Sequence, residues 1–194
     1  LLASNLGKKV SRNLGAIQTS GLVVQIGTAS KSLMPGLRVG WTVAPRDLLD
    51  KLVVLKQAND LHTSTFNQML AYELATTILE AHTDMLRRTY RARRDAMVDT
   101  LRTHLPNSAH FSAPKGGMFV WLTLPPGLDG KALLEKALVE EKIAFVPGAA
   151  FHADGSGKNT LRLSFSTCPP AVIAEAMERL SNLIKREAQR LTHL

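Results

Sequence analysis

Lys31 and Arg38 lie seven residues apart in a segment whose composition suits the binding of a small anionic ligand. The segment reads GTASKSLMPGLRVGW over 27–41 and follows an apolar, β-branched run over 22–26, of the type found in buried parallel strands. Open α/β sheets bind their ligands beyond the carboxyl ends of such strands. We therefore expect this segment to carry a ligand site.

The chemistry open to this lysine and arginine is that of an aldehyde and a phosphate. A lysine shielded from water near other cations gives up its proton more easily, and its neutral amine attacks a carbonyl carbon to form a Schiff base. The charged fork of an arginine suits a phosphate dianion. A turn at Pro35-Gly36 can bring both side chains to one ligand, although the extended link from Lys31 to Arg38 spans about 23 Å. Pyridoxal 5′-phosphate carries both groups, but a phosphate pocket with an unreactive lysine uses the same parts.

The small residues around the lysine fit the same site. Thr28 and Ser30 supply hydroxyl groups for a phosphate, and Gly27 lets a ligand approach the backbone closely.

Arg162 is a second candidate for anion binding. In LRLSFS over 161–166, strand alternation places the apolar residues on one face and Arg162 with the two serines on the other. A bidentate pair between an arginine and a carboxylate orients every amino acid in the same way. The alternative is a strand arginine paired with a structural carboxylate.

Two regions of different pattern position these residues. The first has strands over 22–26 and 39–43 and helices over about 48–58, capped by Asp47, and 64–80. The second has short strands that alternate with helices, a pattern of α+β or split βαβ structure. Its strands are expected near Phe111 and over 118–124, 143–146 and 160–165, and its helices over 129–141 and 170–190. A helix over about 82–105 connects the regions, which predicts domains at 1–81 and 82–194.

The composition bounds the class of protein. The net charge of +8 gathers mainly in the helix over 82–105, and an ordinary solvated face explains it better than a phosphate-binding face, because no DNA-binding spacing accompanies it.

One cysteine, Cys168, rules out an internal disulfide and any site built from several cysteines. No apolar run is long enough to span a membrane and the start of the chain does not resemble a secretory signal, so we expect a cytoplasmic protein with no metal, membrane or nucleic-acid partner. The arginines of the helix are Arg87, Arg88, Arg91, Arg93, Arg94 and Arg102.

Several motifs, in order, resemble the fold-type I pyridoxal-phosphate aminotransferases of class I/II. The likeness is to the branch with 2-aminoadipate and aromatic aminotransferases, and it covers about 22–190. After GTASKSLMPGLRVGW it continues through DLHTSTFNQMLAYEL (60–74), YRARRDAM (90–97), PKGGMFVWLTLP (114–125), FVPGAAFHADG (145–155) and NTLRLSFS (159–166).

The resemblance implies a role for each candidate. Lys31 is the lysine that forms the Schiff base with pyridoxal 5′-phosphate, Arg38 holds the cofactor phosphate, and Arg162 clamps the substrate α-carboxylate. Thr28 and Ser30 join Arg38 at the phosphate. Gly117 lies near the substrate pocket, and His62 receives no catalytic role. The family moves an amino group from an L-amino acid to a 2-oxo acid, and a homodimer is expected.

The same resemblance implies parts that cannot be placed in this chain. An aromatic residue on the cofactor ring, an asparagine and a tyrosine for the ring hydroxyl, and an aspartate for the ring nitrogen should precede the lysine strand, but residues 1–13 do not match that pattern. We therefore expect an α/β remnant of the large cofactor-binding domain followed by an α+β small domain, with activity incomplete in this chain. Two alternatives remain: the effector-binding domain of a winged-helix transcription regulator, or an inactive truncated fragment.

Overall fold

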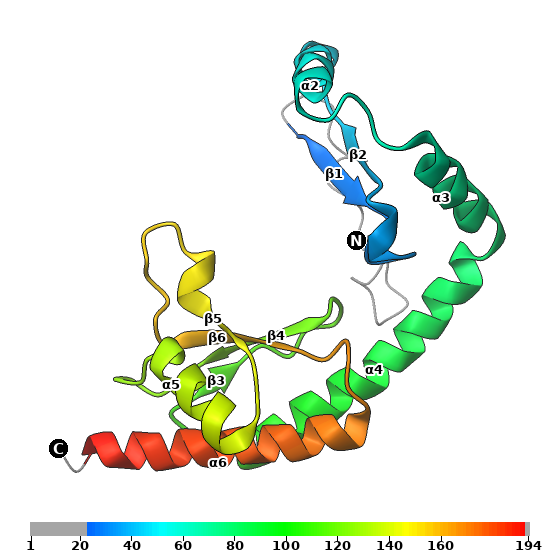
Figure 1. Ribbon diagram of the computed structural model, residues 1–194. Helices are drawn as coiled ribbons and strands as arrows, with labels where there is room; N and C mark the ends of the chain where they lie inside the picture. The colour runs from blue at the N-terminus through cyan, green and yellow to red at the C-terminus, as the bar shows by residue number, and fades with distance from the viewer. Residues whose placement is uncertain (1–22, 193–194) are drawn as a thin grey trace. The chain divides into compact units, whose positions relative to one another are not determined.

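The computed structural model describes residues 23–192, which form two compact units that divide after Arg87 (Figure 1). The division falls inside one long helix, α4 (Leu79–His104). The domain boundary expected after residue 81 stays a prediction. The expectations about residues 1–13, and the first residue of the strand expected over 22–26, lie outside the described residues.

A β-hairpin is the centre of unit 1. Strand β1 (Gln25–Thr28) pairs antiparallel with β2 (Gly40–Val43), and the chain turns through a 3-10 helix, η2 (Pro35–Leu37). The turn expected at Pro35-Gly36 is therefore present. The parallel pairing suggested by the β-branched run is not found between these two strands, because the connection over 29–39 is shorter than the dozen or more residues that a parallel crossover needs.

Two helices follow the hairpin. In α3 (Thr65–Thr77), the Ser64 hydroxyl accepts a hydrogen bond from the Asn67 backbone N–H at 3.4 Å, as expected for a cap at this position. The expected cap at Asp47 is wrong: α2 (Arg46–Asn59) begins two residues earlier than expected, and Pro45 occupies the cap position. Asp47 instead lies in the first turn, where a carboxylate interacts favourably with the helix dipole.

The described part of unit 1, residues 23–87, has a small apolar core. Its buried apolar cluster consists of Ala29, Leu37 and Ala71, with four partly buried neighbours, and α2 has no buried residue. Large apolar side chains stay exposed on both strands and on α2 and α3, among them Ile26 at 73% and Phe66 at 72%. These apolar surfaces of unit 1 lack the packing partners that stabilise an amphipathic element.

Unit 2 is an antiparallel sheet with helices. Its strand order is β3-β4-β6-β5. The expected strands and helices are present, but β4 and β6 are shorter than expected, β5 is shifted toward residue 147, and α6 extends two residues further. The helix expected over 129–141 changes from α to π geometry after residue 136, and a further 3-10 helix follows β5. The elements are β3 (His110–Phe111), β4 (Phe119–Thr123), α5 (Gly130–Lys136), η3 (Ala137–Glu141), β5 (Val146–Pro147), η4 (Gly148–Phe151), β6 (Thr160–Ser164) and α6 (Pro170–Thr192).

The core of unit 2 lies between its sheet and the helices. Figure 1 shows α6 beside the C-terminal half of α4, and side chains of both helices join those of β4 and β6 in one cluster. The prediction that the apolar residues of 161–166 share one strand face and Arg162 lies on the other is confirmed. Leu161, Leu163 and Phe165 are at most 2% exposed, and Arg162 is half-buried on the opposite face. The fold of the chain is thus α/β in class, with an α+β second unit. None of the helices within residues 23–192 combines the length and apolar character needed to cross a membrane.

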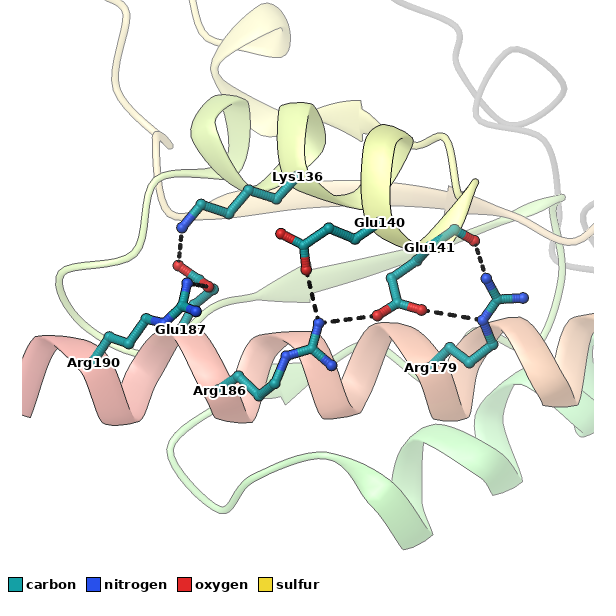
Figure 2. Close-up of polar contacts among 7 residues, drawn as sticks. All are labelled: Lys136, Glu140, Glu141, Arg179, Arg186, Glu187 and Arg190. Carbon is teal, nitrogen blue, oxygen red and sulfur yellow. Dashed lines mark hydrogen bonds and ion pairs between the residues drawn. The ribbon is translucent and has the colours of Figure 1, made fainter.

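A network of ion pairs joins η3 to α6 (Figure 2). Glu141 accepts hydrogen bonds from Arg179 at 3.1 Å and from Arg186 at 3.0 Å, and its side chain is only 14% exposed. Arg186 also pairs with Glu140, and a second group beside it joins Lys136 of α5 and Arg190 to Glu187 of α6. Because its carboxylates are paired, this surface fastens the π-helix to the last helix of unit 2.

The network should make unit 2 sensitive to acid. The hydrogen bond from Arg186 most strongly, and that from Arg179, hold the pKa of Glu141 below its ordinary value, against the opposing effect of burial. This stabilisation is complete above the unfolded-state pKa and is lost as the pH falls through the folded-state pKa. We expect Glu141→Gln to lower the free energy of unfolding by about 1–2 kcal/mol at pH 7, with a smaller difference below about pH 4. Urea unfolding at both pH values measures this.

The control for Glu141 is an exposed pair of the same unit. Asp99 and Arg102 pair at 2.8 Å with side chains 68% and 64% exposed, so Asp99→Asn should change stability by less than about 0.5 kcal/mol. An effect of Glu141→Gln no larger than that of Asp99→Asn would show that the network contributes nothing specific.

Candidate functional site

The β1–β2 hairpin gathers the hydroxyl residues at the end of β1. Thr28 Oγ1 lies 3.0 Å from Ser30 Oγ and 3.3 Å from the carbonyl oxygen of Val39, and it accepts a hydrogen bond from the Ser30 backbone N–H at 3.1 Å. The Ala29 backbone N–H also donates to Val39 O at 2.9 Å. Since Arg38 directly precedes Val39, its backbone lies at the end of β1 that carries Thr28 and Ser30.

Lys31 follows Ser30 at the same end of the hairpin. Its side chain is exposed, and no acidic side chain among residues 23–192 forms an ion pair with it. The shielding from water considered from the sequence is therefore not provided by residues 23–192, which leave the lysine side chain exposed. Its primary amine is free to react with a carbonyl group.

Arg38 has an unusual backbone conformation. Its φ of 52° lies in the left-handed region, where residues other than glycine are uncommon. Its guanidinium donates to the carbonyl oxygen of Pro35 at 3.0 Å, and the side chain is exposed. An arginine in a position that favours glycine points to a functional use of its side chain.

This backbone conformation allows a test that separates function from stability. We expect Arg38→Gly to preserve or slightly raise the thermal midpoint, because glycine adopts this conformation without cost, while phosphate affinity falls at least about tenfold. Arg38→Ala should lose affinity equally but keep a thermal midpoint below that of Arg38→Gly, because alanine bears the same cost of this conformation as arginine. Thermal unfolding and titration with pyridoxal 5′-phosphate measure the two effects. Equal stability of the two variants would contradict the conformational argument.

Gly27 has a different role from the one expected. Its register partner in β2 is Trp41, and a Cβ added at Gly27 would lie 2.1 Å from the indole ring. The glycine therefore makes room for the indole ring of Trp41. The structure does not show a ligand-accessible backbone at Gly27. Trp41 also lines a cavity of about 340 Å³ with Ala29, Ala71 and Tyr72.

Arg162 lies in unit 2, in β6, opposite Trp121 of β4 and Val146 of β5. Its guanidinium carbon lies 4.0 Å from the ring centroid of Phe119 and 4.5 Å from that of Phe151. No carboxylate among the described residues forms an ion pair with it, which removes the structural pairing considered as an alternative within this part of the chain. The arginine can therefore bind a carboxylate.

The aromatic residues around Arg162 are functional candidates that the sequence argument missed. A signal was available, since alternation along FVWLT places Phe119 and Trp121 on one face of β4. The antiparallel register then sets Trp121 opposite Arg162. Phe151 could not be found in this way, because it comes from η4 and reaches the arginine only through the fold.

Two arginines of α4 differ from the solvated face expected for this helix. Arg93 donates to the carbonyl oxygen of Ser166, just beyond β6, and Arg94 donates to that of Pro114 at 3.3 Å. Both side chains are half-buried. Arg93 thereby fixes the backbone a few residues after Arg162.

The two remaining residues singled out from the sequence have structural surroundings. His62 is exposed, and its Nδ1 lies 2.8 Å from the carbonyl oxygen of Thr63. Gly117 has a φ of 85° in the turn before β4, a conformation that glycine adopts without strain. Neither observation adds a chemical role.

Comparison with known proteins decides the family. The family model for aminotransferase class I and II matches residues 7–180. This chain belongs to that family. The match begins earlier and ends earlier than the range of about 22–190 expected from the motifs.

Individual relatives of this aminotransferase chain agree with the family match. The 2-aminoadipate transaminase of Thermus thermophilus is 46% identical over 163 residues, which cover 84% of this chain and 41% of the relative. The crystal structure of Pyrococcus horikoshii kynurenine aminotransferase, in complex with PMP, superimposes with a TM-score of 0.90 at 38% identity and covers 95% of this chain and 46% of that one. The HTH-type transcriptional regulator NorG of Staphylococcus aureus is 32% identical over 167 residues. The chain thus spans less than half the length of the aminotransferases that it matches.

Pyridoxal 5′-phosphate is the cofactor of class I and II aminotransferases, and the donors of the hairpin suit it. Lys31 offers a free amine for an aldehyde, while two hydroxyls and a guanidinium offer donors for a phosphate. The donor set therefore fits the cofactor, as far as residues 23–192 supply it.

Proposed function

We propose that this chain forms the C-terminal part of an aminotransferase that moves an amino group from an L-amino acid to a 2-oxo acid, commonly 2-oxoglutarate. The observation that carries the proposal is the hairpin end, where Thr28 and Ala29 hydrogen-bond to the carbonyl oxygen of Val39, the residue after Arg38, and where Lys31 directly follows Ser30. The family membership of the chain supports the same assignment.

Each candidate residue has a part in this proposal. Thr28, Ser30 and Arg38 would hold the phosphate of pyridoxal 5′-phosphate, and Lys31 would bind its aldehyde carbon. The bound cofactor supplies an electron sink for negative charge at the substrate Cα. The Lys31 amine, released when the substrate amino group takes its place on the cofactor, would take the proton from Cα as a base and give it up again as an acid during turnover. Arg162 would orient the substrate by binding its α-carboxylate through two N–H groups.

The exposed apolar surfaces of unit 1 support the view that activity needs more protein than residues 23–192. The side chains of Ile26 and Phe66 are 73% and 72% exposed, and soluble domains seldom leave such surfaces uncovered. We propose that further parts of the aminotransferase fold cover them, that the complete enzyme is a homodimer, and that it acts in the cytoplasm.

Cofactor trapping tests the proposal. The chain, expressed with any coding sequence upstream of residue 1, is incubated with pyridoxal 5′-phosphate and reduced with borohydride, and peptides are analysed by mass spectrometry. We expect a cofactor mass increment on Lys31 and transamination of a panel of amino acids with 2-oxoglutarate. A protein without visible absorbance, mass increment or amino transfer would refute the proposed function.

A second candidate is the effector-binding domain of a transcription regulator. The identity of 32% to NorG favours it, because that relative is named as an HTH-type regulator. The coding sequence upstream of residue 1 separates the candidates: a winged-helix domain there supports the regulator, and the remaining cofactor-binding half supports the enzyme. An inactive fragment is indicated if neither is encoded and no cofactor binds.

A further inference from the structure

The guanidinium N–H groups of Arg162 form no ion pair with a carboxylate among the described residues of unit 2. The side chain is half-buried, and among the described residues no acidic side chain pairs with it. Its guanidinium carbon instead lies over two aromatic rings, 4.0 Å from the centroid of Phe119 and 4.5 Å from that of Phe151. A ring face attracts the cation through the ring quadrupole and does not require its N–H groups to point at an acceptor. Those N–H groups remain available to a planar anion.

The two rings come from separate elements, so the fold must bring them to the arginine. Phe119 begins β4, and its register partner in β6 is Ser164, two residues beyond Arg162. Phe151 ends η4 and meets the ring of Trp121 edge to face, with the centroids 5.5 Å apart. Trp121 is in turn the register partner of Arg162.

The position of Phe151 is fixed by tight packing at the start of η4. A Cβ added at Gly148 would lie 1.7 Å from the Thr160 hydroxyl oxygen, so η4 approaches β6 as closely as only glycine permits. Phe151 itself is 46% exposed and lies outside the buried cluster of unit 2. Core packing therefore does not account for a large aromatic side chain at this place.

We propose that Phe151, together with Phe119, is a positioning residue for Arg162. The ring faces restrict the guanidinium, while its N–H edge stays open for the carboxylate of an amino acid or 2-oxo acid. This inference rests on the proposed function, because it assigns the carboxylate of the substrate to Arg162. An arginine already ordered by its neighbours loses less conformational freedom when the ligand binds.

The test distinguishes an effect of the aromatic ring at position 151 from an effect of side-chain volume. In the chain expressed with any upstream coding sequence, Phe151→Leu keeps apolar volume but removes the ring, and Phe151→Tyr keeps the ring. We expect Phe151→Leu to raise KM for the amino acid about fivefold, with kcat within about twofold and cofactor affinity unchanged. Phe151→Tyr should keep KM at the value of the unchanged protein. A KM for Phe151→Tyr as high as that for Phe151→Leu would overturn the proposal.

Two further variants make the outcome specific. Phe111→Leu removes a partly buried ring from the same sheet, and an equal rise in KM there would overturn the proposal by showing general damage to the sheet. Arg162→Gln tests the underlying assignment. If Arg162→Gln leaves KM unchanged, the proposed function of Arg162 fails; if it raises KM while Phe151→Leu does not, the positioning role alone fails.

A spectroscopic measurement on the 194-residue chain does not depend on activity. A guanidinium over a ring face experiences ring currents, so we expect the Arg162 Nε–H resonance upfield of its ordinary position in NMR spectra. Phe151→Leu should move it downfield, and Phe111→Leu should leave it in place. An Arg162 signal that does not respond to Phe151→Leu would overturn the contact on which the proposal depends.

Discussion

Replacement of Lys31 by alanine is expected to abolish the covalent capture of pyridoxal 5′-phosphate and to lower kcat about 10²–10⁴-fold. The reason is that the proposed enzyme uses this amine twice, as the group that bonds the cofactor aldehyde and as the base that moves the Cα proton. The amine follows Ser30 at the hairpin end, where the hydroxyls and Arg38 supply donors for the phosphate. Visible absorbance, borohydride trapping and steady-state rates measure the effect.

The matched control for Lys31 is an exposed lysine away from the hairpin end. Lys51 lies in α2, where its side chain is exposed, and Lys51→Ala should leave trapping and rate unchanged. Phosphate binding in Lys31→Ala should persist, because Thr28, Ser30 and Arg38 are intact. Retention of borohydride trapping in Lys31→Ala would mean that another amine carries the cofactor and would remove the basis of the site.

Replacement of Phe165 by alanine is expected to lower the free energy of unfolding of unit 2 by about 3–5 kcal/mol. The side chain is 0% exposed and is among the largest in the buried cluster between the sheet, α4 and α6. Its backbone N–H also donates to the carbonyl oxygen of Met118 at 3.1 Å, which places the ring at the end of the strand that carries Arg162. Urea unfolding followed by far-UV circular dichroism measures the loss.

Two comparisons control for the size and place of this change. Phe165→Leu keeps most of the apolar volume and should cost clearly less than the alanine variant. Val139 lies in η3 with 72% of its surface exposed, so Val139→Ala should change stability by less than about 0.5 kcal/mol. A loss at Phe165→Ala as small as that at Val139→Ala would contradict the packing described for unit 2.

The stability and the proposed site depend on different parts of the chain. Unit 2 contains the large apolar cluster, whereas Lys31 and Arg38 lie in unit 1, where the buried cluster formed by residues 23–87 has three small or medium side chains with their neighbours. A variant can therefore unfold unit 2 without touching the lysine. Measurements of cofactor binding and of unfolding should be made on the same samples so that the two effects are separated.

Local patterns in the sequence were enough to predict most elements. The helix that starts near residue 64, the turn at Pro35-Gly36 and the buried face of 161–165 all follow from short-range chemistry, and the structure agrees. The cap predicted at Asp47 was wrong by two residues, because Pro45 occupies the cap position of this helix without a side-chain hydrogen bond. The roles of Lys31, Thr28, Ser30, Arg38 and Arg162 came from residue chemistry together with family resemblance, and they remain proposals.

Contacts between distant segments were decided only by the tertiary structure. The sequence by itself determined which face of β6 carries Arg162, because strand alternation is a property of neighbouring residues. It did not determine that Phe151 lies over that arginine, that Trp41 fills the space above Gly27, or that Arg93 binds the carbonyl oxygen of Ser166. Each of these contacts joins residues more than ten positions apart, and such a contact is set by strand register and helix packing, which depend on the whole unit at once.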